Sequence, residues 1–309
     1  MATGLSTVFL TGASGLIGSL VHRRLLAAGH EVWAHRRRPP AEAAEAGTRW
    51  IGGDLTADGA WQQAAAAADA VVHLAGAPIA QGRWNAARKA ELVTSRLEST
   101  RRIVSALGAA DRPPSLLICA SATGYYGARG EERLEEAAAP GDDFLARLCV
   151  DWEAAAQEAT RSGVRVVSLR FGAVLSRRGG VLAAMEPVFR WGLGGALGPA
   201  DRYFPWIHEE DAAGLIEWAL DSSSAAEGAV NAVAPEAVRM GEWARQLAAV
   251  LGRRAWLHVP GFALRGLLGE LGDSLAPGQH VIPGAALAGG YTFRHPRLET
   301  ALRALLRSL

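Results

Sequence analysis

The sequence predicts an α/β fold built on a doubly wound parallel sheet, followed by a smaller C-terminal substrate lobe. Short β-rich runs alternate with longer amphipathic or alanine-rich segments through the first 170 residues, which is the pattern of repeated β-α-β units. A glycine-rich turn, Gly12–Gly18, joins the first β-rich run to the first helical segment. Together these observations favour a Rossmann-like sheet in a chain of 309 residues, which is long enough for a large core.

Six segments of the first half are expected to be strands, because they are short, rich in aliphatic residues and separated by turn or helix signals. These segments are Thr7–Thr11, Glu31–Ala34, Arg49–Ile51, Ala70–Leu74, Ser115–Ala120 and Val164–Arg170. Three longer segments between them are expected to be helices, with Gly29 and Gly108 placed to end the first two. These helices are Leu16–Ala28, Asn85–Leu107 and Asp143–Arg161.

The pattern changes after Arg170. Two glycine-rich loops and two helices are expected there, at residues 179–180 and 192–198 and at Asp211–Leu220 and Met240–Leu251. The uncharged window Ser274–Phe293 has the length of a membrane span, but its prolines and glycines would break a lipid-exposed helix, so we interpret it as loop. We place the main domain at residues 1–245, with its substrate side mainly after residue 171, and a small C-terminal module at residues 246–309.

Charge and cysteine usage exclude several classes of protein. The formal net charge is +1, so no global field draws the chain to nucleic acid or to anionic membranes. Cys119 and Cys149 lack the spacing of a zinc site or a disulfide framework, which predicts no bound metal and fits a reducing cytoplasm. The first residues do not read as a signal peptide. We therefore expect a cytoplasmic protein with neither nucleic acid nor membrane as partner.

The segment Thr11–Gly18 reads Thr-Gly-Ala-Ser-Gly-Leu-Ile-Gly and carries a dinucleotide-binding signature. In such turns Gly12 permits the tight turn, Gly15 lets backbone amides approach a pyrophosphate, and Gly18 lets the helix pack closely on the sheet. The alternative is an ordinary strand-to-helix turn. We expect the cofactor to contact Thr11, Gly12, Ser14, Gly15, Leu16, Ile17 and Gly18.

The end of the second strand indicates which dinucleotide binds. NAD-binding folds usually place Asp or Glu there to bind the adenosine ribose, whereas this chain reads His-Arg-Arg-Arg over His35–Arg38. Guanidinium groups grip a 2′-phosphate that a carboxylate would repel, so Arg36 and Arg37 favour NADP(H) over NAD(H). A solvated basic turn is the alternative.

Residues at two further strand ends complete the predicted cofactor site. Asp54 and Leu55 follow the third strand, where an adenine-contacting acid often lies, and the fourth strand ends in Leu74, Ala75 and Gly76, where small residues leave room for the dinucleotide. Each signal is weak alone. Their value is that they occur in order at the carboxyl ends of strands, where open α/β sheets bind ligands.

These motifs resemble the extended short-chain dehydrogenase/reductases, in their epimerase/dehydratase branch, and more narrowly its family 39U. The narrower resemblance covers nearly the whole chain. It rests on Thr11–Gly18, His73–Ile79, Arg83-Trp84 with Lys89 and Ser95-Arg96, Ser121–Gly127, Trp152-Glu153, Arg190–Gly195, Trp206–His208, Gly278–Pro283, Tyr291–Phe293 and Ala301-Leu302. The last three segments look like the small C-terminal domain of unknown function found in that family. The resemblance adds Ser95 to the expected cofactor contacts, and it suggests a homodimer, although no helix here is decisively an interface.

The resemblance also implies a catalytic pair that this chain lacks. In active members of the superfamily a Ser or Thr after the fifth strand works with Tyr-x-x-x-Lys on the next helix. The Tyr moves the proton, and the Lys lowers its pKa and holds the nicotinamide ribose. With Trp152-Glu153 in the usual register, Leu145 takes the Tyr position and Cys149 the Lys position. Since a phenol with a pKa of about 10 needs a nearby cation to act at neutral pH, another group must move the proton.

Six residues are candidates for that role. They are Ser121, Thr123, Tyr125, Tyr126, Cys149 and His208. The two hydroxyls and the tyrosine pair share one loop, and for the tyrosines a packed pair with satisfied hydroxyls is the structural alternative. The cysteine is alternatively a small core residue, and the histidine, which alone has a plausible cleft position, is alternatively a structural one.

The remaining candidates would lie on the substrate side. Lys89 and Trp84 are expected to line the pocket, with a solvated lysine and a core tryptophan as the alternatives. The loop Arg190–Gly198 is expected to be flexible and to fold over a ligand. Asp211, at a helix start, is expected to complement the helix dipole.

Two functional hypotheses follow. The first is an NADP(H)-dependent oxidoreductase or epimerase-like enzyme acting on a small organic molecule, with the cofactor carrying the hydride. The second is a non-catalytic NADP(H)-binding regulator or scaffold, in which loss of the Tyr/Lys pair reflects loss of turnover. The step from the fold to a particular reaction rests on analogy.

Overall fold

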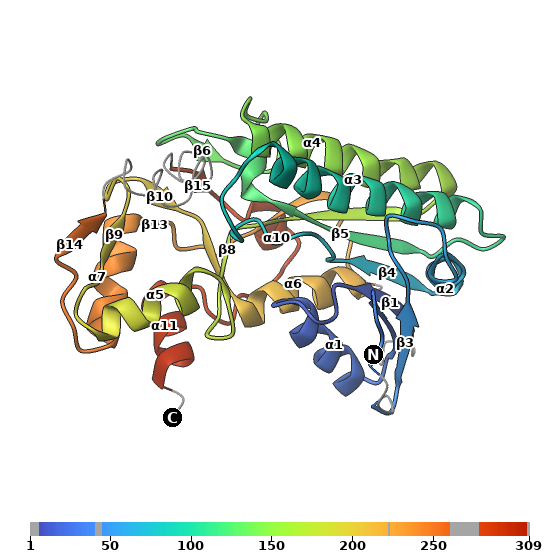
Figure 1. The fold of residues 1–309 in the computed structure, drawn as a ribbon, viewed down its shortest axis with the longest axis horizontal. Helices are drawn as coiled ribbons and strands as arrows, with labels where there is room; N and C mark the ends of the chain where they lie inside the picture. Colours follow the sequence, from blue (N-terminus) through green and yellow to red (C-terminus); the bar gives the residue numbers. More distant parts are fainter. Residues whose placement is uncertain (1–5, 41–44, 222, 260–277, 308–309) are drawn as a thin grey trace.

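The computed structural model describes residues 6–40, 45–221, 223–259 and 278–307. Its centre is a seven-stranded sheet in the order β12-β7-β5-β4-β1-β2-β3, and every neighbouring pair is parallel (Figure 1). The strands are β1 Thr7–Thr11, β2 Glu31–Arg36, β3 Thr48–Gly52, β4 Ala70–His73, β5 Leu116–Ala122, β7 Arg165–Phe171 and β12 Gly228–Ala232. The predicted Rossmann-like sheet is confirmed.

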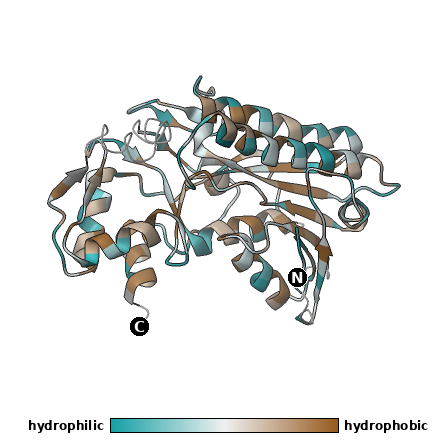
Figure 2. Cartoon of the chain, viewed as in Figure 1, coloured by the Kyte–Doolittle hydropathy of each residue, from teal (hydrophilic) through white to brown (hydrophobic). Residues whose placement is uncertain are grey.

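Helices cover both faces of this sheet, as a doubly wound fold requires. On one face, α1 (Gly18–Ala27) and α6 (Glu209–Leu220) pack through Val21, Leu25 and Ile216 onto the strands. The other face is covered by α2 (Trp61–Ala67), α3 (Ala86–Gly108) and α4 (Phe144–Gln157). Hydrophobic residues follow the sheet between these two layers, where the core lies (Figure 2).

Side chains and glycines set the ends of the predicted helices. Asn85 and Asp143 cap α3 and α4 by accepting from backbone amides of their first turns. Gly29 follows α1 with a positive φ of 88°, as expected for a residue that ends a helix. Gly108 is the last residue of α3 rather than the first beyond it. The third predicted helix ends as α4 at Gln157 and continues as a 3-10 turn, η2 (Glu158–Ser162).

The second half holds more regular structure than the sequence predicts. A smaller lobe forms around α5 (Gly180–Arg190), α7 (Met240–Val250) and α11 (Leu298–Arg307), with side chains such as Trp206 and Trp243 in its core. The first and last of these helices, and β12, were not predicted. Helix α5 begins at a glycine and contains Pro187, two signals that usually indicate a loop.

Two expected loops are therefore partly wrong. The loop Arg190–Gly198 includes β9 (Gly195–Leu197), which pairs with β14 (Leu257–Val259). The window Ser274–Phe293 includes β15 (His280–Val281) and α10 (Gly284–Ala288), while its first four residues lie outside the described part. Glycine and proline in these two windows lie within or beside short strands and a helix, so they did not indicate a lack of regular structure. The predicted domain boundary after residue 245 falls within α7, and the division stays a prediction.

Five more two- or three-residue strands form small two-stranded sheets apart from the main sheet, and among them β6 pairs with β15. They are β6 Arg133–Leu134, β8 Ala173–Leu175, β10 Tyr203–Phe204, β11 Trp206–His208 and β13 Val238–Arg239. Strand β8 pairs with β11, and β10 pairs with β13. The chain thus leaves the sheet after β7 and returns through α6 and β12 (Figure 1).

Asp211 connects the C-terminal segment to α6, which is more than the predicted helix-dipole role. Its side chain is fully buried and accepts hydrogen bonds from the backbone amides of Arg294 (2.7 Å) and His295 (2.9 Å). The hydroxyl of Tyr291 donates to the same carboxylate at 3.1 Å, and burial, together with the charge of this carboxylate, raises the pKa of Tyr291. The carboxylate therefore ties residues 291–295 to the first turn of α6.

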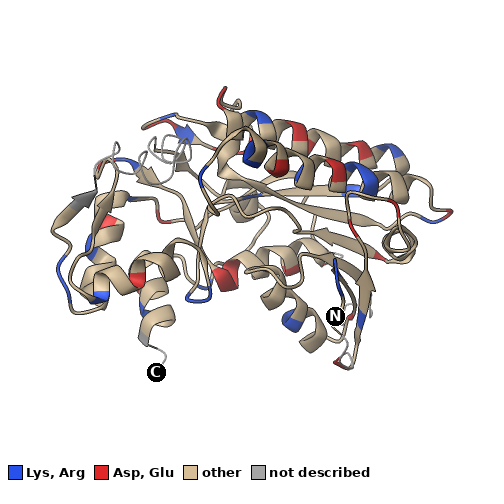
Figure 3. Cartoon of the chain, viewed as in Figure 1, with Lys and Arg blue, Asp and Glu red and all other residues tan. Residues whose placement is uncertain are grey.

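Charged residues of both signs are distributed over the elements of the chain (Figure 3). Blue and red residues alternate along α3 and α4, so no single-sign face is visible there (Figure 3). Within the described ranges, no helix is long and apolar enough to cross a membrane.

The Asp211→Ala variant should be less stable by about 3 kcal/mol, because two amides and one hydroxyl lose a buried acceptor. Urea unfolding monitored by circular dichroism measures this loss. Asp211→Asn, which keeps one acceptor oxygen, is the matched control and should lose less. An unchanged free energy of unfolding in the alanine variant would contradict the anchoring role.

Candidate functional site

The glycine-rich turn is too tightly packed for side chains at two of its positions. Gly12 has a positive φ of 70°, and a Cβ there would lie 2.8 Å from the carbonyl carbon of Leu74. A Cβ on Gly18 would lie 2.1 Å from the carbonyl oxygen of Gly12. The amide of Gly15 closes the turn on that same oxygen at 2.8 Å. Gly18 therefore permits close approach of α1 to the turn, and Gly12 permits close approach of the turn to the end of β4.

The N-terminus of α1 is open to an anion. No side chain caps it and no acidic residue lies in its first turn, while Ser14 and Gly15 are exposed and Leu16 and Ile17 are half-buried. The positive end of the helix dipole and its first amides are therefore not capped by a side chain of the helix. This is the arrangement that holds a pyrophosphate.

A buried histidine joins the ends of β1 and β4 to α3. The Thr11 hydroxyl accepts from the amides of Leu74 (3.1 Å) and Ala75 (3.2 Å), so its own proton goes to Nδ1 of His73 at 2.7 Å. Nε2 of His73 then donates to Ser99 at 3.1 Å. Burial lowers the pKa of His73 to about 3, which keeps the ring neutral and preserves this sequence of donors. Thr11 thus positions the backbone beside the turn.

Cations and an acid lie at the ends of β2 and β3. Arg36 lies over the ring of Trp50 at 5.3 Å, and Arg37 and Arg38 are exposed. None of the three arginines forms an ion pair with another described residue, which leaves them available to a phosphate. Asp54 is exposed, and its hydrogen bonds from the amide and hydroxyl of Thr56 lower its pKa.

Two of the predicted cofactor residues have structural contacts. The Leu55 side chain is buried in the core under α2 and α3. The Ser95 hydroxyl accepts from the Ala77 amide at 3.1 Å and donates to the Leu92 carbonyl at 3.3 Å, so it fixes the segment after Gly76. Both residues shape the edge of the expected cofactor site.

At the end of β5, Ser121 belongs to a charged network that the sequence did not reveal. Its hydroxyl donates to Glu153 on α4 at 2.6 Å. Arg170, at the end of β7, holds the same carboxylate with two hydrogen bonds, of 2.8 and 2.7 Å. Burial lowers the pKa of Arg170, but the bonds and charge of Glu153 outweigh burial and raise it above the usual value. The carboxylate is therefore oriented with one oxygen on the serine.

The tyrosine pair lies on the other side of Arg170. Tyr126 is fully buried, accepts from Arg170 at 2.9 Å and donates to Asn231 at 2.7 Å, while burial raises its pKa. Its contacts match the structural alternative for this residue. Tyr125 is half-buried, and its ring centroid lies 3.4 Å from the guanidinium carbon of Arg170. Thr123 is buried where η1 (Thr123–Tyr126) begins.

Leu145 and Cys149 face the same loop from α4. A Cβ on Gly124 would lie 3.2 Å from Leu145 and 3.9 Å from the Cys149 sulfur. Burial, together with the charge of Glu153, raises the pKa of Cys149 to about 12, so the residue is a neutral thiol at physiological pH. These contacts favour the core interpretation of Cys149 over an acid–base role.

His208 caps α6 and is a poor proton donor. Its Nδ1 accepts from the Glu210 amide at 3.0 Å, and burial with the neighbouring His295 lowers its pKa to about 4. These two histidines and Glu210 bring donor atoms within 4.8 Å of one another. The rings, however, are stacked at 3.7 Å and 26°, so their lone pairs do not converge on one point, and Nε2 of His208 carries the proton. The geometry is that of a helix cap.

The other predicted pocket residues lie beside α4. Trp84 is 5 % exposed, donates to the Ile79 carbonyl at 2.9 Å and packs edge-on against Phe144, which matches the core alternative. The ammonium of Lys89 lies 5.1 Å from the centroid of the Phe144 ring.

Arg178 is a contact residue that sequence reasoning missed. Its guanidinium donates to the Leu16 carbonyl at 3.1 Å and to Ser19 at 2.8 Å, and it pairs with Glu209 at 2.8 Å. It therefore connects the start of the smaller lobe to the glycine-rich turn. No local motif marks it, because its partners are more than 30 and more than 150 residues distant.

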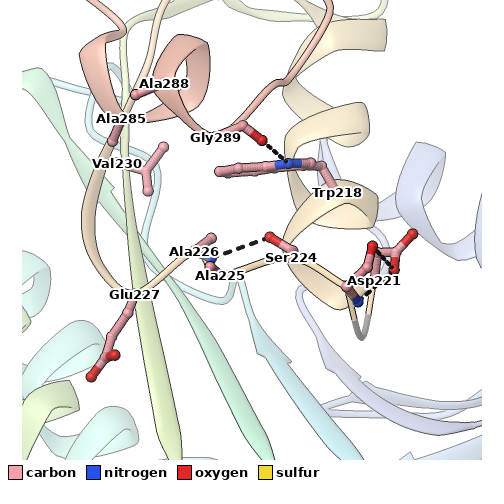
Figure 4. A pocket seen from close by; sticks show the side chains of 11 residues that line it. Trp218, Asp221, Ser224, Ala225, Ala226, Glu227, Val230, Ala285, Ala288 and Gly289 are labelled. Carbon is pink, nitrogen blue, oxygen red and sulfur yellow. Dashed lines mark hydrogen bonds between the residues drawn. The ribbon is translucent and has the colours of Figure 1, made fainter.

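A separate surface pocket lies at the end of the sheet where β12 begins, opposite the carboxyl ends of the strands. Trp218, Asp221, Val230 and Ala285 are among its lining residues (Figure 4). Most of its lining residues belong to the end of α6 and to the segment that leads into β12, so it is at the amino end of that strand, away from the glycine-rich turn. Parallel α/β sheets bind their cofactors at the carboxyl edge, so this pocket is not the cofactor site.

The strand order reverses between β1 and β4, and the open turn lies at this switch point, which defines a dinucleotide-binding Rossmann fold. The model of the NAD dependent epimerase/dehydratase family matches residues 8–233, and a domain of unknown function (DUF1731) matches residues 259–305. The chain belongs to the NAD dependent epimerase/dehydratase family, among the SDR39U1-type epimerase family proteins, which confirms the resemblance.

Relatives match along almost the full chain. A chloroplastic SDR39U1 homolog of Arabidopsis thaliana is 38% identical over 97% of this chain and 87% of its own length. Human epimerase family protein SDR39U1 is 35% identical over 97% of this chain and 99% of its own. The crystal structure of human SDR39U1 (isoform 2) with NADPH aligns with a TM-score of 0.87 and 35% identity, covering 98% of this chain and 100% of that one.

His73 should make the protein sensitive to acid. Its pKa is about 3 when folded and 6.5 ordinarily, so the unfolded chain binds the extra proton between these values. Stability from this group is present above pH 6.5 and falls by at most about 1.4 kcal/mol per pH unit as the pH drops toward 3. Urea unfolding at several pH values measures the slope.

The His73→Gln variant should be less stable at neutral pH but show a shallower loss below pH 6.5. His280→Gln, which removes a histidine outside this network, is the control and should leave the His73 contribution to the slope in place. An identical slope in the His73 variant would show that its ring is not held neutral in the folded protein.

Proposed function

We propose that the protein is an NADP(H)-dependent oxidoreductase or epimerase-like enzyme acting on a small organic substrate. The observation that carries the cofactor part is the juxtaposition of an uncapped α1 N-terminus with unpaired arginines at the end of β2. NADP(H) presents a diphosphate and a 2′-phosphate, so both features have a matching anion. The crystallised human relative carries NADPH, which supports the same choice here.

The residues present fit this cofactor. A side chain at Gly12 or Gly18 would clash with backbone atoms of Leu74 or of Gly12 itself, so these glycines are required for the shape of the turn that would hold the diphosphate. Backbone amides near Leu16 and Ile17 would hold it, and Arg36 and Arg37 would bind the 2′-phosphate. When bound, the nicotinamide supplies hydride transfer.

Ser121 is the group best placed to move the proton. It lies at the end of β5, where the superfamily has a catalytic hydroxyl, and it donates to a carboxylate instead of cooperating with a Tyr. When Oγ of Ser121 accepts a proton, the hydrogen that Oγ already carries can pass along its hydrogen bond to Glu153. Arg170 balances the charge of Glu153. Ser121 and Glu153 together can therefore accept and return one proton.

The alternative is a non-catalytic NADP(H)-binding regulator or scaffold. The observation that favours it is the apolar contact of Leu145 on Gly124 and the neutral, buried Cys149, where related enzymes have the Tyr and Lys. Neither residue can replace that pair. The cytoplasmic location, the homodimer and the two-domain division predicted from the sequence stay predictions.

The double variant Arg36→Gln/Arg37→Gln should bind NADPH about tenfold to hundredfold more weakly, because two charge-assisted contacts to the 2′-phosphate are lost. Its affinity for NADH, which has no such phosphate, should change little. Fluorescence titration of the reduced nicotinamide measures both. Arg49→Gln, a nearby arginine stacked on Trp33, is the control. Equal weakening for NADH would contradict the assignment.

Wild-type protein should oxidise NADPH in the presence of at least one member of a broad panel of aldehydes and ketones. The loss of absorbance of the reduced nicotinamide measures this reaction. Ser121→Ala should slow this turnover by about hundredfold or more while NADPH affinity is retained, because a proton donor is lost and no cofactor contact is. No turnover across the panel would favour the regulator, and full activity of the variant would remove Ser121 from the mechanism.

A further inference from the structure

Arg96 on α3 is a buried cation that no carboxylate of the described chain balances. It is 6 % exposed. Its Nη atoms donate to the carbonyl oxygens of Leu92 (3.2 Å) and Ala77 (3.0 Å), and its guanidinium carbon lies 5.1 Å from the ring centroid of Trp152. Its Nε is buried without a hydrogen-bond partner. Burial lowers its pKa only to about 10, so it stays charged at neutral pH.

An unbalanced charge in such a position destabilises a protein unless something else compensates it. Arg170 shows the contrast, since it is equally buried but holds Glu153 with two hydrogen bonds. In Arg96, by contrast, the Nε has no hydrogen-bond acceptor and the positive charge has no carboxylate partner among the described residues. A ligand with oxygen acceptors would satisfy both.

The sheet places Arg96 on the nicotinamide side of the cofactor site. A Cβ on Gly76, just after β4, would lie 3.3 Å from its guanidinium carbon. Strands β4 and β2 lie on opposite sides of β1. If the diphosphate lies at the turn after β1 and the 2′-phosphate at Arg36–Arg38 after β2, the nicotinamide half must extend over β4 and β5, toward Arg96.

Arg96 also lies near the position where related enzymes have their lysine. In the register set by Trp152-Glu153, that position is Cys149 on α4. The guanidinium carbon of Arg96 lies 5.1 Å from the ring centroid of Trp152, which is three residues after Cys149 on α4. The fold therefore brings a cation from α3 to the region from which α4 has lost one.

We propose that Arg96 binds oxygen atoms of the nicotinamide ribose and its phosphate, so that α3 supplies the cation that the Tyr-x-x-x-Lys motif otherwise supplies from α4. The inference rests on the proposed function, because it takes NADP(H) as the ligand. It concerns binding and assigns Arg96 no part in proton transfer.

Two probes separate the halves of the cofactor. NADPH contains both halves, and 2′,5′-ADP contains only the adenosine half with its 2′-phosphate. Arg96→Met should weaken NADPH binding about tenfold to hundredfold and leave 2′,5′-ADP binding unchanged. Arg96→Lys, which keeps the charge, should recover part of the NADPH affinity. Arg37→Gln is the matched control and should weaken both probes. Calorimetry measures all four proteins.

The outcomes distinguish the two proposals. Wild-type protein that binds neither probe overturns the proposed function and this inference with it. Wild-type protein that binds both, with Arg96→Met indistinguishable from it or weakened equally for both probes, overturns only the inference.

Thermal melting supplies a readout that a purely structural role would not give. Without ligand, Arg96→Met should melt no lower than wild type, because an apolar side chain of similar length replaces an unbalanced charge. The rise in melting temperature produced by saturating NADPH should shrink in the variant. A variant that melts lower without ligand and retains the full NADPH shift would identify Arg96 as a structural residue and overturn the proposal.

Discussion

The approach of Gly18 to the carbonyl oxygen of Gly12 is the constraint on which the rest of the site depends. A Cβ at 2.1 Å from that oxygen cannot be accommodated, so only glycine lets α1 begin directly against the turn. The same turn lies against Leu74 at the end of β4, and Thr11 holds that end through the amides it binds. The uncapped amides of α1 and the edge of β4 are thereby fixed relative to each other before any ligand binds.

The charges of the site fall into two kinds. Arg170 and Arg178 are paired with carboxylates and join elements of the protein: the first connects β7 to α4, and the second connects the smaller lobe to the glycine-rich turn. Arg37, Arg38 and Arg96 form no ion pair within the described ranges, and they flank the turn on its two sides. Paired cations maintain the fold, whereas unpaired ones are available to a ligand with anionic groups at both ends.

Local sequence patterns correctly predicted the glycine-rich turn, because its conformation depends on residues that are neighbours in the sequence. Strand β1 and the turn after it could be located from a few neighbouring residues, since Gly12–Gly18 has a backbone requirement of its own. The same reasoning failed for α5, whose Gly180 and Pro187 resemble loop signals although the helix buries Leu182 and Phe189 in the smaller lobe. Tertiary packing there overrides the local preference.

The rest of the site depends on contacts between distant residues, and a single sequence does not show which charges meet. Glu153 and Arg170 were visible as residues, but their pairing needs β7 beside α4, and the missing partner of Arg96 is visible only in three dimensions. The same holds for Cys149, whose reactivity depends on burial and not on its neighbours in sequence. Loss of Tyr and Lys from α4 therefore does not by itself remove acid–base or cationic groups from the site, because β5 and α3 bring Ser121 and Arg96 to the same edge of the sheet.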